Sequence, residues 1–342
     1  MDYRIFPPEG ILETTVSRLP LSKSVAARLL ILNALTPGAP SVSPSVLPDC
    51  TDTDIMRAAV NIHRGTVHAG DSGTALRFLT AYYAATEGCD ITITGSDRLC
   101  MRPLAPLIDT LRTLGADIEY TGREGFAPLH IRGRRLDGGH VSLDARSSSQ
   151  FASALCMVAP GMRQGLSIDL GGQIPSMPYL RMTLAMLQSR GIDAHISGYT
   201  VVVPPGILAP AEHEAERDWS AAAFWYAISA ASAGWVTIQG LTASRLQGDA
   251  ILAEIGPRFG VITDFEDNDA CLSATPDIFS RLDMDMSDYP DLVPALAVIS
   301  CLIGMPFSFT GVANLRLKES DRLKALADNL LTLGIITETG PD

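Results

Sequence analysis

Apolar positions repeat one arrangement four times along the chain. In each copy, apolar residues at helical spacing lead to a glycine suited to a helix C-terminal cap. A short stretch rich in β-branched or aromatic residues follows, which predicts a strand. The four copies occupy residues 107–120, 182–196, 251–265 and 323–337, and their glycines are Gly115, Gly191, Gly260 and Gly334. The last three copies recur about every 70 residues, so the pattern predicts a repeated α/β unit.

A turn and a returning strand follow each of the first three copies. The returning strands are expected at residues 128–131, 200–203 and 270–272. Helices followed by hairpins predict mixed sheets packed under helices. The fourth copy lacks this return, since the chain ends soon after a predicted strand at 335–340. We therefore expect an unpaired sheet edge, an incomplete last unit and a C-terminal piece absent from this chain.

The first strongly apolar helix is predicted between Pro20 and the stop signal at residues 36–38. A serine or other hydroxyl residue is expected to cap its start. Ser24 and Arg28 lie one turn apart and share a face. Lys23 stands at the helix start, where backbone N–H groups and the helix dipole favour an anion. These residues predict a phosphate or carboxylate site, and the alternative is an ordinary capped helix with two exposed cations.

Four further stretches resemble this helix start, because each combines a turn or cap with basic or hydroxyl residues. They are residues 70–77, 98–104 with Arg102, 147–151 with three serines and a glutamine, and 314–322. Each alone suits a capped terminus or a solvated face. Together, converging helix N-termini can hold a multiply charged anion even on an acidic protein.

Composition narrows the class of protein. The 342 residues are enough for two domains of ordinary size, and 46% hydrophobic with 19% charged residues is typical of a well-buried globular protein. A net charge of −12 argues against general binding to nucleic acid or a membrane surface. The six cysteines form no C-x-x-C pair and the six histidines no H-E-x-x-H motif, so no metal site is expected.

The N-terminus carries early charge and no apolar signal core, which favours a cytoplasmic protein. Two uncharged blocks, 219–244 and 292–315, are long enough to cross a membrane. Gly234 interrupts the first, and Pro294 and Pro306 interrupt the second. We therefore expect buried core elements in both blocks.

In sequence order, the motifs of this chain resemble those of the EPSP synthase (3-phosphoshikimate 1-carboxyvinyltransferase) family. The matching motifs are Lys23-Ser24 with Arg28, residues 73–77, Arg102-Pro103, 148–150, 176–179, 247–249, 289–291 and 314–322. They extend from Lys23 to Arg322 and cover nearly all of the chain, and the ordered set is highly specific.

The resemblance implies an enolpyruvyl transferase fold, of the inside-out α/β barrel type. Two similar domains, each built from βαβαββ units, would close over the substrate. The first domain would comprise residues 1–20 plus 216–342, with Asp291, Lys318 and an incomplete last unit, and the inserted domain residues 21–215, with Lys23, Arg102 and 148–150. The family normally has one more unit, which supplies a further arginine and lysine to the phosphoenolpyruvate pocket.

The implied activity is that of a transferase of the shikimate pathway, which makes aromatic amino acids. It moves the enolpyruvyl group of phosphoenolpyruvate to the 5-hydroxyl of shikimate 3-phosphate and releases phosphate, through a tetrahedral intermediate and with no cofactor or metal. A monomer with no nucleic-acid or membrane partner is expected. The implied catalytic residues are Asp291, Glu319, Lys23 and Lys318. Asp291 would be the base toward the hydroxyl, Glu319 would exchange a proton with the methylene carbon, and Lys23 would stabilise charge.

The resemblance also implies two ligand sets. Shikimate 3-phosphate would contact Lys23, Ser24, Arg28, Ser148, Ser149, Gln150, Ser176, Tyr179, Asp291, Asn314 and Lys318. Phosphoenolpyruvate would contact Lys23, Gly73, Arg102, Gln150 and Arg322. Arginine suits the planar carboxylate because its fork binds two oxygens at once. For Asp291 and Glu319, the alternative role is a structural ion pair.

One residue departs from the family pattern, and two other functions stay open. Asp71 stands where the family commonly has asparagine. A carboxylate near an anion is unfavourable unless a cation such as Arg77 pairs with it. A UDP-N-acetylglucosamine enolpyruvyl transferase would use a reactive cysteine on a mobile loop, and Cys100 has no such loop around it. A non-catalytic protein that binds shikimate 3-phosphate is the third possibility, because that ligand set is complete while the phosphoenolpyruvate set is not.

Overall fold

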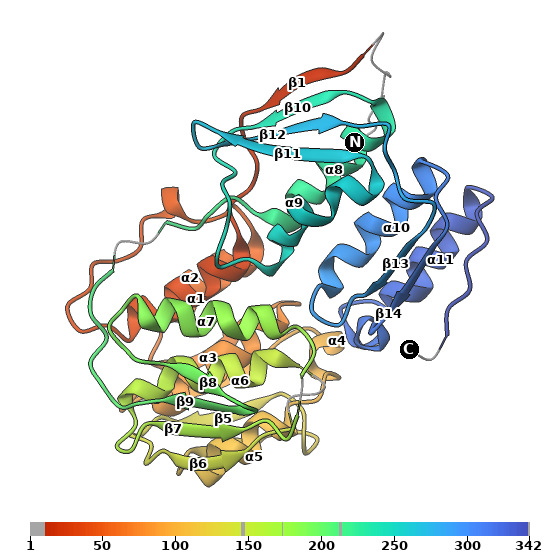
Figure 1. Ribbon diagram of the computed structural model, residues 1–342. Helices are drawn as coiled ribbons and strands as arrows, with labels where there is room; N and C mark the ends of the chain where they lie inside the picture. Colours follow the sequence, from red (N-terminus) through yellow and green to blue (C-terminus); the bar gives the residue numbers. More distant parts are fainter. Residues whose placement is uncertain (1–10, 145–147, 173, 212–213, 341–342) are drawn as a thin grey trace. The chain divides into compact units, whose positions relative to one another are not determined.

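The computed structural model describes residues 11–144, 148–172, 174–211 and 214–340 (Figure 1). Contacts divide the chain into two compact units. The inserted unit comprises Leu21–Ala215 together with the short segment Leu317–Glu319. The discontinuous unit comprises Met1–Pro20, Glu216–Arg316 and Ser320–Asp342. That the two units are separate domains stays a prediction.

The inserted unit contains two four-stranded sheets of the same topology. Their strands are β2 (Arg64–His68), β3 (Asp90–Thr94), β4 (Asp117–Tyr120) and β5 (Leu129–Arg132) in one, and β6 (Gly139–Ser142), β7 (Leu166–Asp169), β8 (His195–Ser197) and β9 (Thr200–Val203) in the other. The strand orders are β2-β3-β5-β4 and β6-β7-β9-β8. In each sheet the first pair is parallel and the returning strand is antiparallel to both neighbours. The predicted helix–glycine–strand copies at 107–120 and 182–196 are confirmed.

Helices bury the core of the inserted unit. They are α1 (Lys23–Ala34), α2 (Thr51–Ala59), α3 (Gly73–Ala85), α4 (Asp97–Cys100), α5 (Ala105–Thr113), α6 (Ser149–Val158) and α7 (Met177–Gln188). Helix α6 packs against both α3 and α7. Because α3 and α6 are covered on several sides, they are apolar nearly all round rather than along one stripe.

Serine side chains cap two of the helix starts that the sequence predicts as parts of an anion site. The Ser72 hydroxyl accepts a hydrogen bond from the Ala75 amide at the start of α3. The Ser148 hydroxyl accepts one from the Gln150 amide at the start of α6. Ser22 occupies the same position before α1 but makes no side-chain cap bond, so the predicted hydroxyl cap there is wrong. Ser22 is buried at this position.

The discontinuous unit repeats the mixed topology in one sheet. Its strands are β1 (Glu13–Val16), β10 (Trp235–Ile238), β11 (Val261–Glu266) and β12 (Asp269–Ala274), in the order β1-β10-β12-β11. The pair β1–β10 is parallel and β12 is antiparallel to both neighbours. The third predicted copy keeps its glycine and strand, but three short helical segments replace the single helix. They are η3 (Gly248–Ile251), α9 (Leu252–Ile255) and η4 (Gly256–Phe259).

Two uncharged helices form the core of this unit. Helix α8 (Trp219–Ser232) packs against α10 (Val293–Leu302). The ring of Tyr226 lies between those of Trp219 and Phe259. The predicted burial of both uncharged blocks is therefore confirmed. Among the residues that the structure describes, none of the helices combines the length and apolar character needed to span a bilayer.

The fourth copy of the repeat differs from the prediction. Helix α11 (Arg322–Thr332) forms, and Gly334 adopts the expected positive φ of 78°. Residues 335–340, however, form no strand. Strands β13 (Leu282–Asp285) and β14 (Phe307–Thr310) pair only with each other within the described part of the chain. In the other sheets, the strand that follows the repeat glycine bonds only to the returning strand. Among the described residues, no returning strand follows Gly334, so residues 335–340 have no strand to pair with.

Candidate functional site

Lys23 is the first residue of α1, and its Nζ lies 3.2 Å from Oδ2 of Asp52 in the first turn of α2. The Lys23 side chain keeps 60% of its surface accessible. Burial lowers the pKa of Lys23, but the carboxylates of Asp52 and Glu319 outweigh it, so the pKa lies above its usual range. Lys23 is therefore a cation at neutral pH, and part of its surface remains open to a ligand.

Arg28 is buried, with 2% of its surface exposed. Its Nε donates to Thr183 Oγ1 at 2.7 Å, and its Nη2 donates to the Tyr179 carbonyl at 2.9 Å. Its Nη1 donates to the Ser24 carbonyl at 2.8 Å. Burial lowers the pKa of Arg28 to about 10. Arg28 thus ties α1 to α7, which contradicts the alternative of two exposed cations, while its predicted role as a substrate ligand stays a prediction.

Two guanidinium groups meet over Gly73, the first residue of α3. A Cβ built on Gly73 would lie 2.4 Å from Nη1 of Arg77 and 2.4 Å from Nη1 of Arg102. A side chain at this place would have to displace one or both guanidinium groups. Arg102 Nη1 also lies 3.2 Å from Oε1 of Glu319, within the inserted unit. The sequence motifs that supplied Gly73 and Arg102 are therefore brought together in space.

Gln150 connects this pair of arginines to the start of α3. Its Oε1 accepts from Arg77 Nη1 at 3.2 Å, and its Nε2 donates to Thr74 Oγ1 at 2.8 Å. Arg77 belongs to a predicted motif but not to the predicted ligand sets. Burial, and next the neighbouring Arg102, lower the pKa of Arg77 to about 9. Asp71 does not pair with Arg77, because it accepts a hydrogen bond from Ser96 instead.

The remaining predicted residues of the inserted unit lie at the starts of α6 and α7. Ser149 is buried at the first position of α6. Ser176 precedes α7 in the left-handed region, with φ 60°, and is also buried. A non-glycine residue held in that region stores strain, which is common at ligand sites. Tyr179 contributes its ring and its carbonyl to the surroundings of Arg28.

Asp291 and Arg322 form an ion pair in the discontinuous unit. Arg322 Nη1 lies 2.8 Å from Asp291 Oδ1, and about a third of each side chain is exposed. Asp291 lies in the short helix η5 (Pro290–Leu292), and Arg322 begins α11. This is the ion-pair role that the sequence leaves open as the alternative for Asp291. Assignments of the two residues to separate substrates stay predictions.

Asp249 is an acidic residue that the sequence motifs include without indicating a role for it. It is buried in η3 and accepts a hydrogen bond from the Ser220 hydroxyl at 2.5 Å. Burial, and next the nearby Asp291, raise the pKa of Asp249 to about 7. The only signal in the sequence is its place in the 247–249 motif, because burial cannot be read from three residues.

Asn314 and Lys318 lie before α11. Asn314 belongs to η6 (Ala313–Leu317), and its Oδ1 is buried without a hydrogen-bond partner. Lys318 follows η6 and is half-buried. A buried amide oxygen without a donor is consistent with a bound polar ligand or water. Among the described residues, no group of three His, Cys, Asp or Glu side chains could hold a metal ion.

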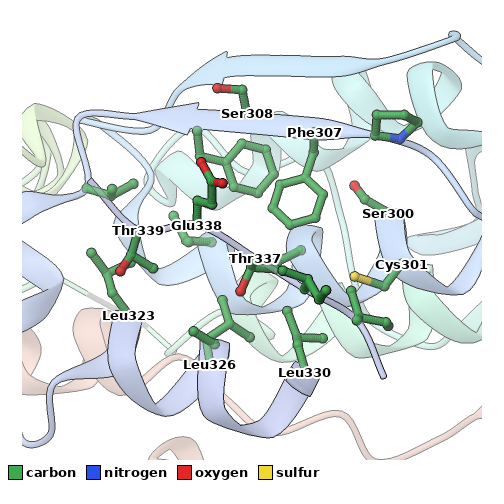
Figure 2. Close-up of a pocket in the computed structure, with 18 of the residues that line it drawn as sticks. Ser300, Cys301, Phe307, Ser308, Leu323, Leu326, Leu330, Thr337, Glu338 and Thr339 are labelled. Atoms are coloured by element: carbon green, nitrogen blue, oxygen red, sulfur yellow. The ribbon is translucent and has the colours of Figure 1, made fainter. Parts of the chain in front are cut away.

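A cavity of about 740 Å³ lies in the discontinuous unit, and none of the predicted catalytic residues lines it. Figure 2 shows Leu323, Leu326 and Leu330 of α11 and Phe307 of β14 around it, with the segment that carries Thr337 crossing it. Its wall is mainly aliphatic and aromatic. Arg281 is the one basic residue among the described residues that line it, so the cavity offers few of the cations that a phosphorylated substrate requires.

These features define a protein of repeated mixed α/β units in which cationic and hydroxyl side chains lie at helix starts. The family model of EPSP synthase (3-phosphoshikimate 1-carboxyvinyltransferase) matches residues 60–342, and the chain belongs to this family. The predicted family and the mixed α/β fold class are thereby confirmed. Within the described residues the sheets remain separate and close no barrel.

Relatives extend over nearly the whole chain. A 3-phosphoshikimate 1-carboxyvinyltransferase of Bacteroides fragilis is 40% identical over 338 residues, covering 98% of this chain and 81% of that protein. One of Syntrophobacter fumaroxidans is 35% identical over 347 residues, covering 95% of this chain and 82% of that protein. A solved EPSP synthase of Acinetobacter baumannii superposes with a TM-score of 0.74 at 21% identity, covering 98% of this chain and 82% of that one. The last comparison shows the shared fold.

Proposed function

We propose that this chain transfers the enolpyruvyl group of phosphoenolpyruvate to the 5-hydroxyl of shikimate 3-phosphate and releases phosphate. Membership of the EPSP synthase family supports the reaction. The observation that carries it is the meeting of Arg77 and Arg102 over Gly73, beside Gln150. A carboxylate or phosphate is favoured by the positive charge of both groups, and a charge-assisted hydrogen bond from Arg102 would be among the strongest available.

The residues of the inserted unit suit the phosphoenolpyruvate part of the reaction. We propose that Lys23, Gly73, Arg102 and Gln150 hold this substrate with Arg322. Lys23 stays protonated at neutral pH and can stabilise charge on the phosphate and on the intermediate. Glu319, already beside Arg102, would give a proton to the methylene carbon on addition and take one back on elimination.

The residues proposed for shikimate 3-phosphate come from both parts of the sequence. The inserted unit would supply Lys23, Ser24, Arg28, Ser148, Ser149, Gln150, Ser176, Tyr179 and Lys318, and the discontinuous unit would supply Asp291 and Asn314. Asp291 would accept the 5-hydroxyl proton as the oxygen attacks C2 of phosphoenolpyruvate, and Lys318 would assist. Elimination then breaks the bond from C2 to the phosphate oxygen. The buried Ser149 and Ser176 supply positioned hydroxyls suited to a sugar-like phosphate.

A phosphate-release assay tests this function. Release with both substrates, and not with either alone, is expected. Calorimetry with each substrate separately distinguishes the alternatives, since binding without release would mean a non-catalytic binding protein. Release with UDP-N-acetylglucosamine in place of shikimate 3-phosphate would contradict the proposed acceptor.

We further propose a cytoplasmic monomer, and light scattering after size exclusion would reveal any dimer.

A further inference from the structure

Arg77 is a buried cation without a counter-ion. Only 3% of its surface is exposed, and its Nε is buried with no hydrogen-bond partner. Its Nη1 donates to the neutral Gln150 amide, and its guanidinium carbon lies 5.4 Å from the centre of the Phe151 ring. No carboxylate of the described residues forms an ion pair with it. A buried guanidinium in such surroundings is costly, because a charge leaves water without an opposite charge to replace it.

The second cation at this place makes the arrangement less favourable still. Arg102 points its Nη1 at the same space over Gly73. Arg102 has Glu319 as a partner, whereas Arg77 feels that carboxylate only at longer range. Two guanidinium groups repel each other unless an anion lies between or beside them. The pair is therefore arranged for a ligand that carries more than one negative charge.

Arg77 also determines how Gln150 is oriented. It donates to the amide oxygen, which directs the amide nitrogen toward Thr74. Without this donor, Thr74 would be the remaining partner of the Gln150 amide, and its hydroxyl can donate or accept a hydrogen bond. The oxygen and nitrogen of the amide could then exchange places. Arg77 thus orients the predicted ligand Gln150 and lies beside the predicted ligand Arg102.

We propose that Arg77 is a positioning residue whose buried positive charge, acting through Gln150 and beside Arg102, determines how tightly the site over Gly73 holds phosphoenolpyruvate. The inference rests on the proposed function for the identity of this dianion. It adds a residue that makes no direct contact of its own with the substrate. The charge and the hydrogen bond of Arg77 make separable contributions, and different substitutions report on each.

The test compares Arg77→Met, Arg77→Lys and a matched control, Arg190→Met. Arg190 is equally buried in the same unit, donates to Thr36, and also has unpartnered nitrogens. Calorimetry with phosphoenolpyruvate alone, and with shikimate 3-phosphate alone, gives the dissociation constants. Arg77→Met is expected to weaken phosphoenolpyruvate about tenfold or more, the scale of one lost charged interaction. Shikimate 3-phosphate should change less than about twofold.

Arg77→Lys provides a readout that a purely structural residue would not change. Burial lowers the pKa of a lysine below its usual value of about 10.4. The lysine variant should then bind phosphoenolpyruvate well near pH 7 and progressively worse toward about pH 8.5, as the amine loses its proton. Arg77 itself, with a pKa of about 9, stays largely charged over the same interval, so the native chain should change less. This pH profile also serves if the methionine variant does not fold.

Three results with the variants would overturn the inference. They are native affinity for phosphoenolpyruvate in Arg77→Met, an equal loss for both substrates, and the same loss in Arg190→Met. A native chain that binds shikimate 3-phosphate but not phosphoenolpyruvate would overturn it too. A native chain that binds neither substrate refutes the proposed function itself. Phosphate release by the native chain together with an unaltered Arg77→Met variant refutes only the role of Arg77.

Discussion

The inserted and the discontinuous units carry opposite kinds of charge at their candidate residues. In the inserted unit, Lys23, Arg77 and Arg102 lie at the starts of α1 and α3, with Asp52 beside Lys23 and Glu319 beside Arg102. In the discontinuous unit, Asp249 and Asp291 influence each other, and Arg322 is the cation bonded to Asp291. The first set suits holding an anion, and the second suits accepting a proton. The overall net charge of −12 hides this division.

The comparison teaches that burial acts in opposite senses on the two sets. Burial lowers the pKa of Arg77 and raises the pKa of Asp249, since the charged form is disfavoured in both cases. Arg77 nevertheless remains a cation at neutral pH, with a pKa of about 9. Asp249, with a pKa of about 7, is divided between its two forms at neutral pH. The following predictions test this contrast, from the largest expected effect to the smallest.

The largest effect is expected from removing a proposed catalytic group of the inserted unit. Lys23→Ala and Glu319→Ala should each lower turnover by between about a hundredfold and ten-thousandfold, as is usual for positioned acid–base groups. The fold should survive, because both side chains are substantially exposed. Steady-state phosphate release, measured beside a thermal melt, checks both points. Lys324→Ala is the control, since Lys324 is an exposed lysine paired only with Asp328. Near-normal turnover in either variant would refute that residue's role.

The next effect concerns the acidic set. Asp249 has a folded pKa of about 7 and an unfolded value near 3.8. Its contribution to stability is therefore fully present below about pH 3.8 and is lost as the pH rises to 7, by roughly 4 kcal/mol as an upper estimate. Asp249→Asn removes this titration. The difference in unfolding free energy, variant minus native, should thus increase from pH 5 to pH 8.

Urea unfolding at both pH values measures the difference. Asp264→Asn is the control, because Asp264 lies on the same unit in the exposed part of β11. A difference for Asp249→Asn that does not change with pH would mean that the carboxyl is not held in its protonated form. Burial would then not have opposite effects on the pKa values of the cationic and the acidic residues, and the two units would differ only in which charged residues they contain.

Ligand binding should stabilise the chain by a smaller amount. Shikimate 3-phosphate at about a hundred times its dissociation constant should add roughly 2.7 kcal/mol, because it binds the folded chain and not the unfolded one. A thermal melt with and without the ligand measures this. Shikimate without its phosphate should stabilise much less, since it lacks the phosphate for which the buried hydroxyls of Ser149 and Ser176 are proposed as ligands. Equal stabilisation by both compounds would contradict a phosphate site.

The smallest effect is expected at Gly73. Gly73→Ala places a Cβ against both guanidinium groups, which must move apart by a small distance. Affinity for phosphoenolpyruvate should fall about tenfold, equivalent to about 1.4 kcal/mol, while shikimate 3-phosphate is little affected. Gly161→Ala is the matched control, because a Cβ there meets nothing within 4 Å. Unchanged or increased affinity for phosphoenolpyruvate would show that the position of the two arginines over Gly73 does not matter for binding.

The sequence by itself determined the features that depend on nearby residues. The glycines that end α5 and α7, the serine caps of α3 and α6, and the burial of two uncharged blocks follow from spacing and residue type. The ordered motifs likewise indicate the family through residue type and order alone. Such features can be predicted because a helix cap or an apolar period involves residues only a few positions apart.

Tertiary structure alone decided the features that depend on distant residues. Residues 335–340 have strand-like composition but form no strand, because a strand needs a partner and none of the described segments supplies one. The burial of Arg77 and its meeting with Arg102 over Gly73 depend on packing between α3 and α6 and on the loop before α5. The raised pKa of Asp249 depends on its burial against distant segments and on the charge of Asp291 in η5. Charge and burial at these places arise from contacts between segments far apart in the sequence, so local sequence patterns do not predict them.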